Sequence, residues 1–397
     1  MNQAMQTNPM DAGAIVTAAV IVSAIGALFY NVLPMYLGAA QDYRALGNDQ
    51  IGFIGTAFFL GYTLTSVSAF FWIRKTDWRV VSYLAVAVAA LGLLIAGGSS
   101  TYLNLLVGVF IAGCGFSAIY SVGTTLISDT SNAARWYGAK ITAEAALGVV
   151  LLVLAPTLIL PRWGFAGLSG ALIVTTIVLA PIIIFLPPEG SRQHGAESGR
   201  YTSESNKGPV WFALIACMLF ICGQTAIWGF VERIGNHAGF NPGLVGTLLG
   251  VSLAFAVGGS ALAAWLGNRI GFLKPLVWAH LIFFIGTAIL FRGSQFEFYA
   301  IATCLVMFSV GLGISYAVST VADLDADGRF VVLSVPAIGV GVMIGPGAAG
   351  MLATGTSYSP ILVFGMVTLS LSLFIFFLAD RGRSAAATQL QYKTSED

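Results

Sequence analysis

The sequence predicts an all-α membrane protein with twelve transmembrane helices, arranged as two six-helix bundles that are related by pseudo-symmetry. Three observations predict this fold class. The chain has far fewer charged residues than a soluble protein, its apolar residues form segments of membrane-spanning length, and its two halves carry matching residues at a nearly constant offset.

The composition places most of the surface of this protein against lipid. Hydrophobic residues make up 57% of the 397 residues and charged residues 9%, whereas soluble domains carry about 25% charged residues. The mean hydropathy is +0.87. So few charges do not suffice to cover a water-facing surface. The net charge of +1 provides no basic surface for nucleic acid, which argues against that class of partner.

Twelve segments have the roughly 20 mostly apolar residues that a membrane-spanning helix needs. They lie near residues 13–38, 49–73, 79–97, 101–128, 137–161 and 164–187 in the first half, and near 210–235, 242–268, 272–291, 296–322, 330–353 and 358–379 in the second. The first segment is too long for the apolar part of a signal peptide and has no basic residues before it. We therefore expect it to be retained as a helix.

The distribution of basic residues predicts that both termini lie in the cytoplasm. An even number of spans places the termini on one side, and fourteen of the 18 Lys and Arg residues then fall on or near that side. Short basic loops stay in the cytoplasm during membrane insertion. We expect a multi-pass monomer in the plasma membrane, which is the inner membrane in a bacterium.

A polar stretch divides the chain into two parts. Residues 1–187 form the predicted N-terminal bundle and residues 210–380 the predicted C-terminal bundle. Residues 188–209 between them are rich in Gly, Ser and charged residues, which is typical of a flexible linker, here on the cytoplasmic side. Residues 381–397 are predicted to be a cytoplasmic tail.

The two bundles have related sequences. At an offset of 195 residues, Gly55 matches Gly250 and Arg74 matches Arg269. At an offset of 196 residues, further pairs match, among them Tyr120 with Tyr316, Thr124 with Thr320 and Asp129 with Asp325. Parallel repeats of this kind occur in many secondary transporters, which bind their substrate at the repeat interface near the middle of the membrane.

Over nearly its whole length the sequence resembles the major facilitator superfamily. The resemblance is carried by the six-plus-six layout, the polar central linker and the loop 267–275, which is similar to the family's G-x-x-x-D-R-x-G-R-R loop. Residues 73–79 form its counterpart in the first half. The resemblance implies the family's fold and a role in conformational change for the charged residues of these loops, which are Arg74, Asp77, Arg79, Arg269 and Lys274.

Two positions differ from the pattern of the drug–proton antiporters in this family. Those proteins usually have an arginine in the fourth helix, where this sequence has Val109. They also have a Gly-Pro signature in the fifth helix, where this sequence has Ala155-Pro156, and its own Gly345-Pro346 lies in the eleventh segment. Both differences weigh against an antiporter of that type.

A pair of charged residues lies deep in the fifth segment. Lys140 and Glu144 are four residues apart and therefore share one face of a helix. Glu144 follows Arg135 at the membrane edge by nine residues, which places it roughly 13 Å along the helix. Charged groups inside a membrane are costly and suggest function. Glu144 and Lys140 are candidates for proton coupling or for binding a charged group of the solute, and a structural salt bridge is the alternative.

Hydroxyl groups of the fourth segment lie near this pair. Counted from Asn132 in the turn between the fourth and fifth segments, Thr124 and Lys140 lie at one depth, and Tyr120 and Glu144 lie at another. We therefore expect these side chains to meet. Hydroxyl groups that bond to their own helix or to a neighbouring helix are the alternative.

The resemblance extends the candidate solute-binding site to other segments. In the family's fold, segments one, four, seven and ten line the central cavity. The polar and aromatic residues that this implies as cavity residues are Tyr30, Asn31, Tyr120, Thr124, Gln224, Trp228, Tyr316 and Thr320. The ninth segment is peripheral in the family, so its His280 is expected to be structural.

These features predict a secondary active transporter that moves a small, largely apolar or monoanionic organic solute by alternating access, coupled to protons. Symport and antiport both stay open, with a drug or metabolite efflux antiporter as the alternative. The chain has no Walker-type phosphate-binding motif, and its three His and four Cys residues show no metal-site spacing. We therefore expect no enzyme activity, metal or cofactor. A non-transporting membrane sensor or scaffold is the alternative from another class.

Overall fold

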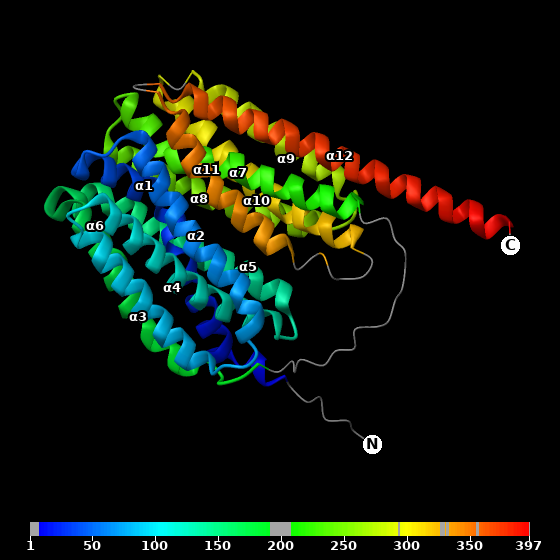
Figure 1. Cartoon of the computed structure of the whole chain (residues 1–397), viewed down its shortest axis with the longest axis horizontal. Coiled ribbons are helices and arrows are strands. Elements are labelled where there is room, and N and C mark those ends of the chain that lie inside the picture. The colour runs from blue at the N-terminus through cyan, green and yellow to red at the C-terminus, as the bar shows by residue number, and fades with distance from the viewer. Residues whose placement is uncertain are drawn as a thin grey trace. The chain divides into compact units, whose positions relative to one another are not determined.

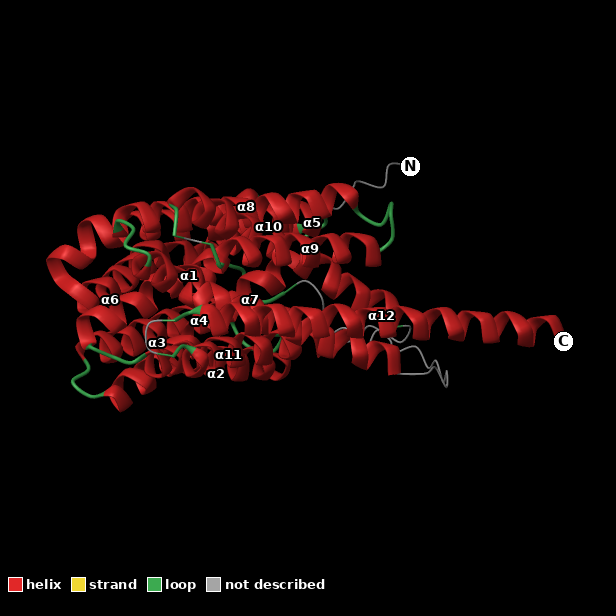
Figure 2. Ribbon diagram, turned by 90° about the horizontal axis from the view of Figure 1, so that it is seen from above, coloured by secondary structure: helices red, strands yellow, loops and turns green. Residues whose placement is uncertain are grey.

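The computed structural model describes residues 8–190, 208–292, 294–325, 330, 333–354 and 357–396, with the side chains of 133–134 and 383–396 left out. All regular elements in these ranges are helices (Figures 1 and 2). Those of the first half are η1 (Pro9–Asp11), α1 (Gly13–Arg44), α2 (Asn48–Trp72), α3 (Trp78–Gly98), α4 (Tyr102–Ser128), α5 (Ala133–Leu154), η2 (Ala155–Ile159), α6 (Leu160–Leu179) and η3 (Ala180–Phe185). Those of the second half are α7 (Gly208–His237), α8 (Pro242–Leu266), α9 (Leu273–Leu290), α10 (Phe296–Leu324), α11 (Ser334–Leu352) and α12 (Ser359–Glu396).

The prediction of twelve membrane-spanning helices is confirmed. Eleven continuous helical stretches in the described residues are long and apolar enough to cross a membrane, and one of them, Arg135–Phe185, has 51 residues. A straight helix of that length would measure about 76 Å, more than twice the ~30 Å of the hydrocarbon core. Gly164 divides this stretch, because its φ of 56° and ψ of −152° are not helical. Glycine adopts this region of positive φ at little cost, so α5 and α6 are two spans.

The two halves repeat one pattern of helix packing. In the first half α1 packs against α4, α5 and α6, and α3 packs against α4 and α6. In the second half α7 packs against α10, α11 and α12, and α9 packs against α10 and α12. The most apolar windows of α1 and α7 are 61% and 72% buried, the largest share in each half. The predicted pseudo-symmetry of two six-helix bundles is therefore confirmed.

The chain divides into two compact units, which are described separately below. The first unit contains Met1–Ala45 and Ala57–Ser198, and the second contains Leu46–Thr56 and Gly199–Asp397, so the first turns of α2 group with the second unit. Residues 191–207, most of the predicted linker, lie outside the described residues. The apolar part of α12 ends at Gly382, and the helix continues to Glu396 through the predicted tail (Figure 1).

The outer helices present large apolar side chains to their surroundings. Leu94 on α3 is 64% exposed, Val178 on α6 is 68% exposed and Phe374 on α12 is 60% exposed. Apolar surface of this extent promotes aggregation in water, whereas lipid tails match it. The fold is therefore that of a multi-pass membrane protein.

A buried ion pair fastens the α2–α3 loop to the end of α4. Arg74 donates two hydrogen bonds to the carboxylate of Asp129, at 2.5 and 2.8 Å. The side chain of Asp129 is fully buried, and that of Arg74 is 17% exposed. Asp77 accepts a hydrogen bond from the backbone N–H of Arg79 at 2.8 Å and so caps α3, while Arg79 donates to the carbonyl of Leu186 after η3. All three predicted loop residues thus make fixed contacts.

The matching loop of the second unit makes different contacts. Arg269 lies over the ring of Trp265, 5.8 Å from its centroid, and Lys274 is exposed. Asp325, the counterpart of Asp129, accepts a hydrogen bond from the backbone N–H of Phe330 at 2.6 Å. In the described residues, the contacts of Arg269 and Asp325 thus differ from those of Arg74 and Asp129.

The segment before α1 packs against the same end of α4. Asn8 donates to the carbonyl of Asp129 at 2.8 Å. Asp11 accepts hydrogen bonds from the hydroxyl of Ser131 and from its backbone N–H, the latter at 2.9 Å. These two bonds favour the charged carboxylate and lower the pKa of Asp11. The end of α4 therefore joins the N-terminal segment and the α2–α3 loop.

We expect Asp129→Ala to lower the free energy of unfolding by about 2–4 kcal/mol, because Arg74 would keep its charge in a mostly buried position without a carboxylate. Denaturant titration in mixed micelles measures this change. Arg135→Ala is the control, since Arg135 is exposed and lies over the ring of Trp136. An equal loss of unfolding free energy in both variants would show that the Arg74–Asp129 pair does not stabilise the fold more than an exposed residue does.

We expect Gly26→Ala to force α1 away from α4. A Cβ atom at Gly26 would lie 2.5 Å from the Cβ of Tyr120 and 2.7 Å from its Cα, so the helices would have to separate, at a cost of about 1–3 kcal/mol. Gly170→Ala on α6 is the matched control, because a Cβ there meets nothing within 4 Å. Thermal unfolding of both variants tests this, and a stable Gly26→Ala variant would contradict it.

Candidate functional site

Lys140 lies in a buried polar cluster of the first unit. Its Nζ donates a hydrogen bond to the hydroxyl of Tyr120 at 2.7 Å and lies 2.7 Å from Oε1 of Glu144. The side chains of Lys140 and Glu144 are 4% and 14% exposed. Nζ also lies 4.2 Å from the centroid of the Tyr120 ring, where the π electrons attract a cation. The ammonium group is therefore held by a charge, a hydroxyl and an aromatic face.

Three helices of the first unit build this cluster. Lys140 and Glu144 are one turn apart on α5, and Tyr120 lies on α4. The close approach of α1 at Gly26 brings Asn31 to α5, where its amide donates to the backbone carbonyl of Glu144 at 2.9 Å. The cluster therefore depends on the packing of α1 against both partners.

Lys140 meets Tyr120, although the sequence places Thr124 at its depth. The lysine side chain extends toward Glu144, which lies one helical turn further from the connection between α4 and α5. Its Nζ therefore reaches the depth of Tyr120. Tyr137 lies about one helical turn nearer to this connection, and its hydroxyl donates to the carbonyl of Thr124 at 3.2 Å. Oγ1 of Thr124 is buried and has no hydrogen-bond partner among the described residues.

The carboxylate of Glu144 is held mainly by charge. Its Oε1 is buried and lies at ion-pair distance from Nζ of Lys140, but it accepts no hydrogen bond of regular geometry from the described residues. An ionised carboxylate has about four acceptor positions, so this one has capacity to spare. It is therefore able to accept a proton or a donor group of a ligand.

Two tyrosines that the sequence analysis did not single out complete the cluster. The ring of Tyr62 on α2 lies 6.0 Å from the ring of Tyr120, and the ring of Tyr137 on α5 lies 5.9 Å from Nζ of Lys140. Tyr137 and Lys140 are three residues apart on one helix face, and this spacing would have identified the contact between them. No sequence signal places Tyr62 of α2 against α4.

The other predicted residue of the first unit is Tyr30 on α1. It is partly buried, and its ring packs edge-on against Phe59 of α2 with a centroid distance of 5.9 Å. The rings that the contacts tie to the ion pair are therefore those of Tyr62 on α2, Tyr120 on α4 and Tyr137 on α5.

The predicted cavity residues of the second unit carry no charge. Gln224 and Trp228 are buried on α7. The hydroxyl of Tyr316 donates to the carbonyl of Gly267 at 2.8 Å, at the end of α8. Thr320 donates to the carbonyl of Tyr316 at 2.8 Å, within its own helix. The hydroxyl groups of Tyr316 and Thr320 thus satisfy backbone carbonyls.

Two other buried groups of the second unit are fully integrated into its packing. The ring nitrogens of His280 lie 2.8 Å from the carbonyl of Leu276 and 3.2 Å from the hydroxyl of Ser372, which fits the expected structural role. Arg233 forms two hydrogen bonds to Glu232 on α7, at 2.6 and 2.8 Å. His280 and the Arg233–Glu232 pair are therefore buried polar groups of the second unit, and the sequence did not predict either of them as a solute site.

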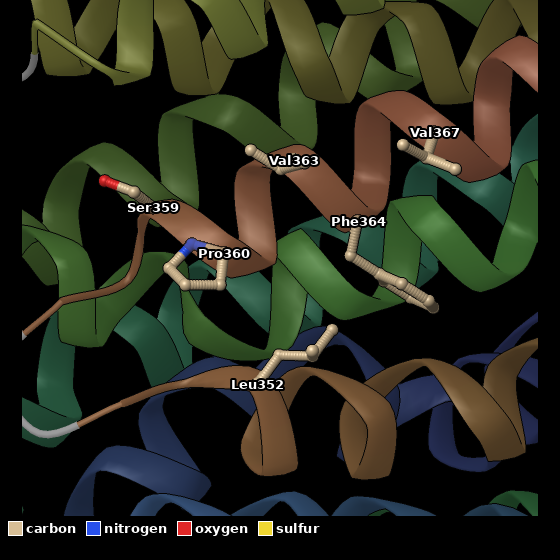
Figure 3. Close-up of a pocket in the computed structure, with 6 residues that line it drawn as sticks. All are labelled: Leu352, Ser359, Pro360, Val363, Phe364 and Val367. Carbon is tan, nitrogen blue, oxygen red and sulfur yellow. The ribbon is translucent and has the colours of Figure 1, made fainter.

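An apolar groove of about 500 Å³ lies at one end of α11 and α12 (Figure 3). Its lining residues are Leu352, Ser359, Pro360, Val363, Phe364 and Val367. Val363 and Val367 are each 50% exposed, so this groove opens to the outside of the unit. It contains none of the predicted site residues, and Ser359 is the one polar residue in its lining. Among the described residues, no group of three or more His, Cys, Asp or Glu forms a metal site.

Solved structures with this fold are transporters. The chain is similar to the crystal structure of a mutant of the nucleoside transporter NupG, with 12% identity and a TM-score of 0.71 over 93% of this chain and 99% of that one. It is also similar to a bacterial homologue of the human lysosomal transporter Spinster in an inward-facing, occupied conformation, with 14% identity and a TM-score of 0.66 over 93% and 96% of the two chains. At such low identity the likeness establishes the fold alone. No curated protein matches the sequence.

The sequence also matches a family profile over most of its length. Residues 15–328 match the profile described as Major Facilitator Superfamily. Together with the twelve helices in two related bundles, this match confirms the resemblance that the loop and linker patterns indicated. The chain therefore belongs to the Major Facilitator Superfamily, and it is a secondary transporter and not an enzyme.

Proposed function

We propose that this transporter carries a small, largely apolar or monoanionic organic solute across the plasma membrane by alternating access, coupled to protons. The Lys140–Glu144 pair is the observation that supports this proposal. It places a cation and a titratable acid within 2.7 Å of each other in the first unit, at a depth where a charge needs a partner.

Each member of the pair suits one part of the task. The ammonium of Lys140 can bind an anionic group of a solute, and the carboxylate of Glu144 can bind and release a proton. The tyrosine rings near the pair suit the apolar part of a solute. Solutes with several negative charges fit poorly, because Lys140 is the one basic side chain in this cluster of the described residues.

The proposed solute-binding residues extend to both units. Beyond Lys140 and Glu144 they are Tyr30, Asn31, Tyr120, Thr124, Gln224, Trp228, Tyr316 and Thr320. We further propose a monomer with both termini in the cytoplasm, on the basis of the distribution of Lys and Arg. Import and export are both compatible with these features, and efflux of drugs or metabolites is the alternative.

We expect Glu144→Gln to abolish solute-driven proton movement. The amide keeps the shape of the carboxyl group, but it cannot bind a proton at physiological pH. To measure this movement, the purified protein is placed in liposomes that contain a pH-sensitive dye, and the dye signal is followed when solute is added outside. Glu297→Gln is the matched control, since Glu297 is exposed at the start of α10. Proton movement that persists in Glu144→Gln would remove Glu144 from the coupling mechanism.

A further inference from the structure

We propose that the solute is a monocarboxylate whose carboxylate replaces Glu144 on Lys140, and that one proton binds Glu144 for each solute bound. This inference rests on the proposed function and specifies both its substrate class and its stoichiometry. It follows from the number of charges in the cluster and from the way each of them is held.

The cluster has no net charge in its observed state. Lys140 contributes one positive charge and Glu144 one negative charge. Among the described residues of the first unit, the other titratable side chains near the pair are Tyr120 on α4, Tyr62 on α2 and Tyr137 on α5, and tyrosine is neutral at physiological pH. The group that α1 contributes is the neutral amide of Asn31.

An additional anion would upset this balance. A second carboxylate beside Lys140 would leave one uncompensated negative charge in a medium of low dielectric constant, which is strongly unfavourable. One proton on Glu144 restores neutrality, with Lys140 and the solute carboxylate as the new ion pair. The proton comes from water on one side and forms an O–H bond with Glu144. It leaves to water on the other side when the solute departs and Glu144 pairs with Lys140 again.

The contacts of Lys140 divide into a fixed part and an exchangeable part. Tyr120 supplies a hydrogen bond of 2.7 Å and an aromatic face, and its backbone is held by the close approach of Gly26 on α1. Glu144 supplies an ion pair of the same 2.7 Å, a contact that another carboxylate is able to make in its place. A solute carboxylate can therefore displace Glu144 while Tyr120 keeps the ammonium in place.

The same charge count excludes other solute classes. A dicarboxylate or a phosphate dianion would leave a negative charge even after Glu144 binds a proton. A cationic solute would compete with Lys140 for Glu144 and leave an unpaired positive charge. A neutral solute would not require any change in protonation.

The test is calorimetric titration of the purified protein with aliphatic and aromatic monocarboxylates of two to ten carbon atoms, each compared with its amide and with a dicarboxylate of similar size. Repeating each titration in buffers of different ionisation enthalpy gives the number of protons taken up per solute bound. We expect binding by monocarboxylates alone, with uptake of one proton. Absence of binding by every monocarboxylate, or uptake of no proton, would overturn the proposal.

Two variants separate the roles of the pair. Glu144→Gln leaves the charge of Lys140 unmatched, so the same monocarboxylate should bind without proton uptake and at least about tenfold more tightly at pH 7, with little dependence on pH. The double variant Lys140→Met with Glu144→Gln remains neutral, which preserves folding, and it should lose this binding. Monocarboxylate binding that survives in the double variant would place the site elsewhere.

These results distinguish this inference from the proposed function. Proton-coupled flux of an amide or of another uncharged solute would leave the transporter assignment intact and refute the monocarboxylate. Solute-driven proton movement that persists in Glu144→Gln in the liposome assay would refute both.

Discussion

The hydrocarbon environment is the constraint on which the rest of this structure depends. Because lipid offers no hydrogen bonds, each span is a helix that satisfies its own backbone, and each buried charge needs a partner. The described ion pairs follow this rule: Arg74 with Asp129, Lys140 with Glu144, and Arg233 with Glu232. The first lies at the end of α4, where it joins a loop to a helix. The second lies within α5, and it is the pair that we propose as the coupling site.

The two units share a scaffold but differ in their charges. The packing of α1, α4 and α5 in the first unit matches that of α7, α10 and α11 in the second. Yet α11 contains no Lys, Arg, Asp or Glu, whereas α5 contains Lys140 and Glu144. The two halves thus repeat one pattern of helix packing, but of α5 and its counterpart α11 only α5 carries a buried ion pair.

Tyr120 and Tyr316 show how the environment decides the role of a residue. They occupy equivalent positions in the repeat. The hydroxyl of Tyr120 accepts a hydrogen bond from Lys140, while that of Tyr316 donates to the carbonyl of Gly267. Without a charged residue on α11, the hydroxyl of Tyr316 satisfies the end of α8. A phenol is able to do either, so its function depends on the neighbouring helix and not on its own helix.

The sequence by itself determined the fold class, the twelve spans and the pairing of Lys140 with Glu144. Span length follows from bilayer thickness, and residues four apart on a helix face each other whatever surrounds them. Only the tertiary structure decided that Lys140 reaches Tyr120 rather than Thr124, that Tyr62 of α2 joins the cluster, and that Asn31 binds the backbone of Glu144. These contacts depend on the direction of a flexible side chain and on where separate helices cross, as at Gly26 and Tyr120, and neither is encoded in the periodicity of one segment.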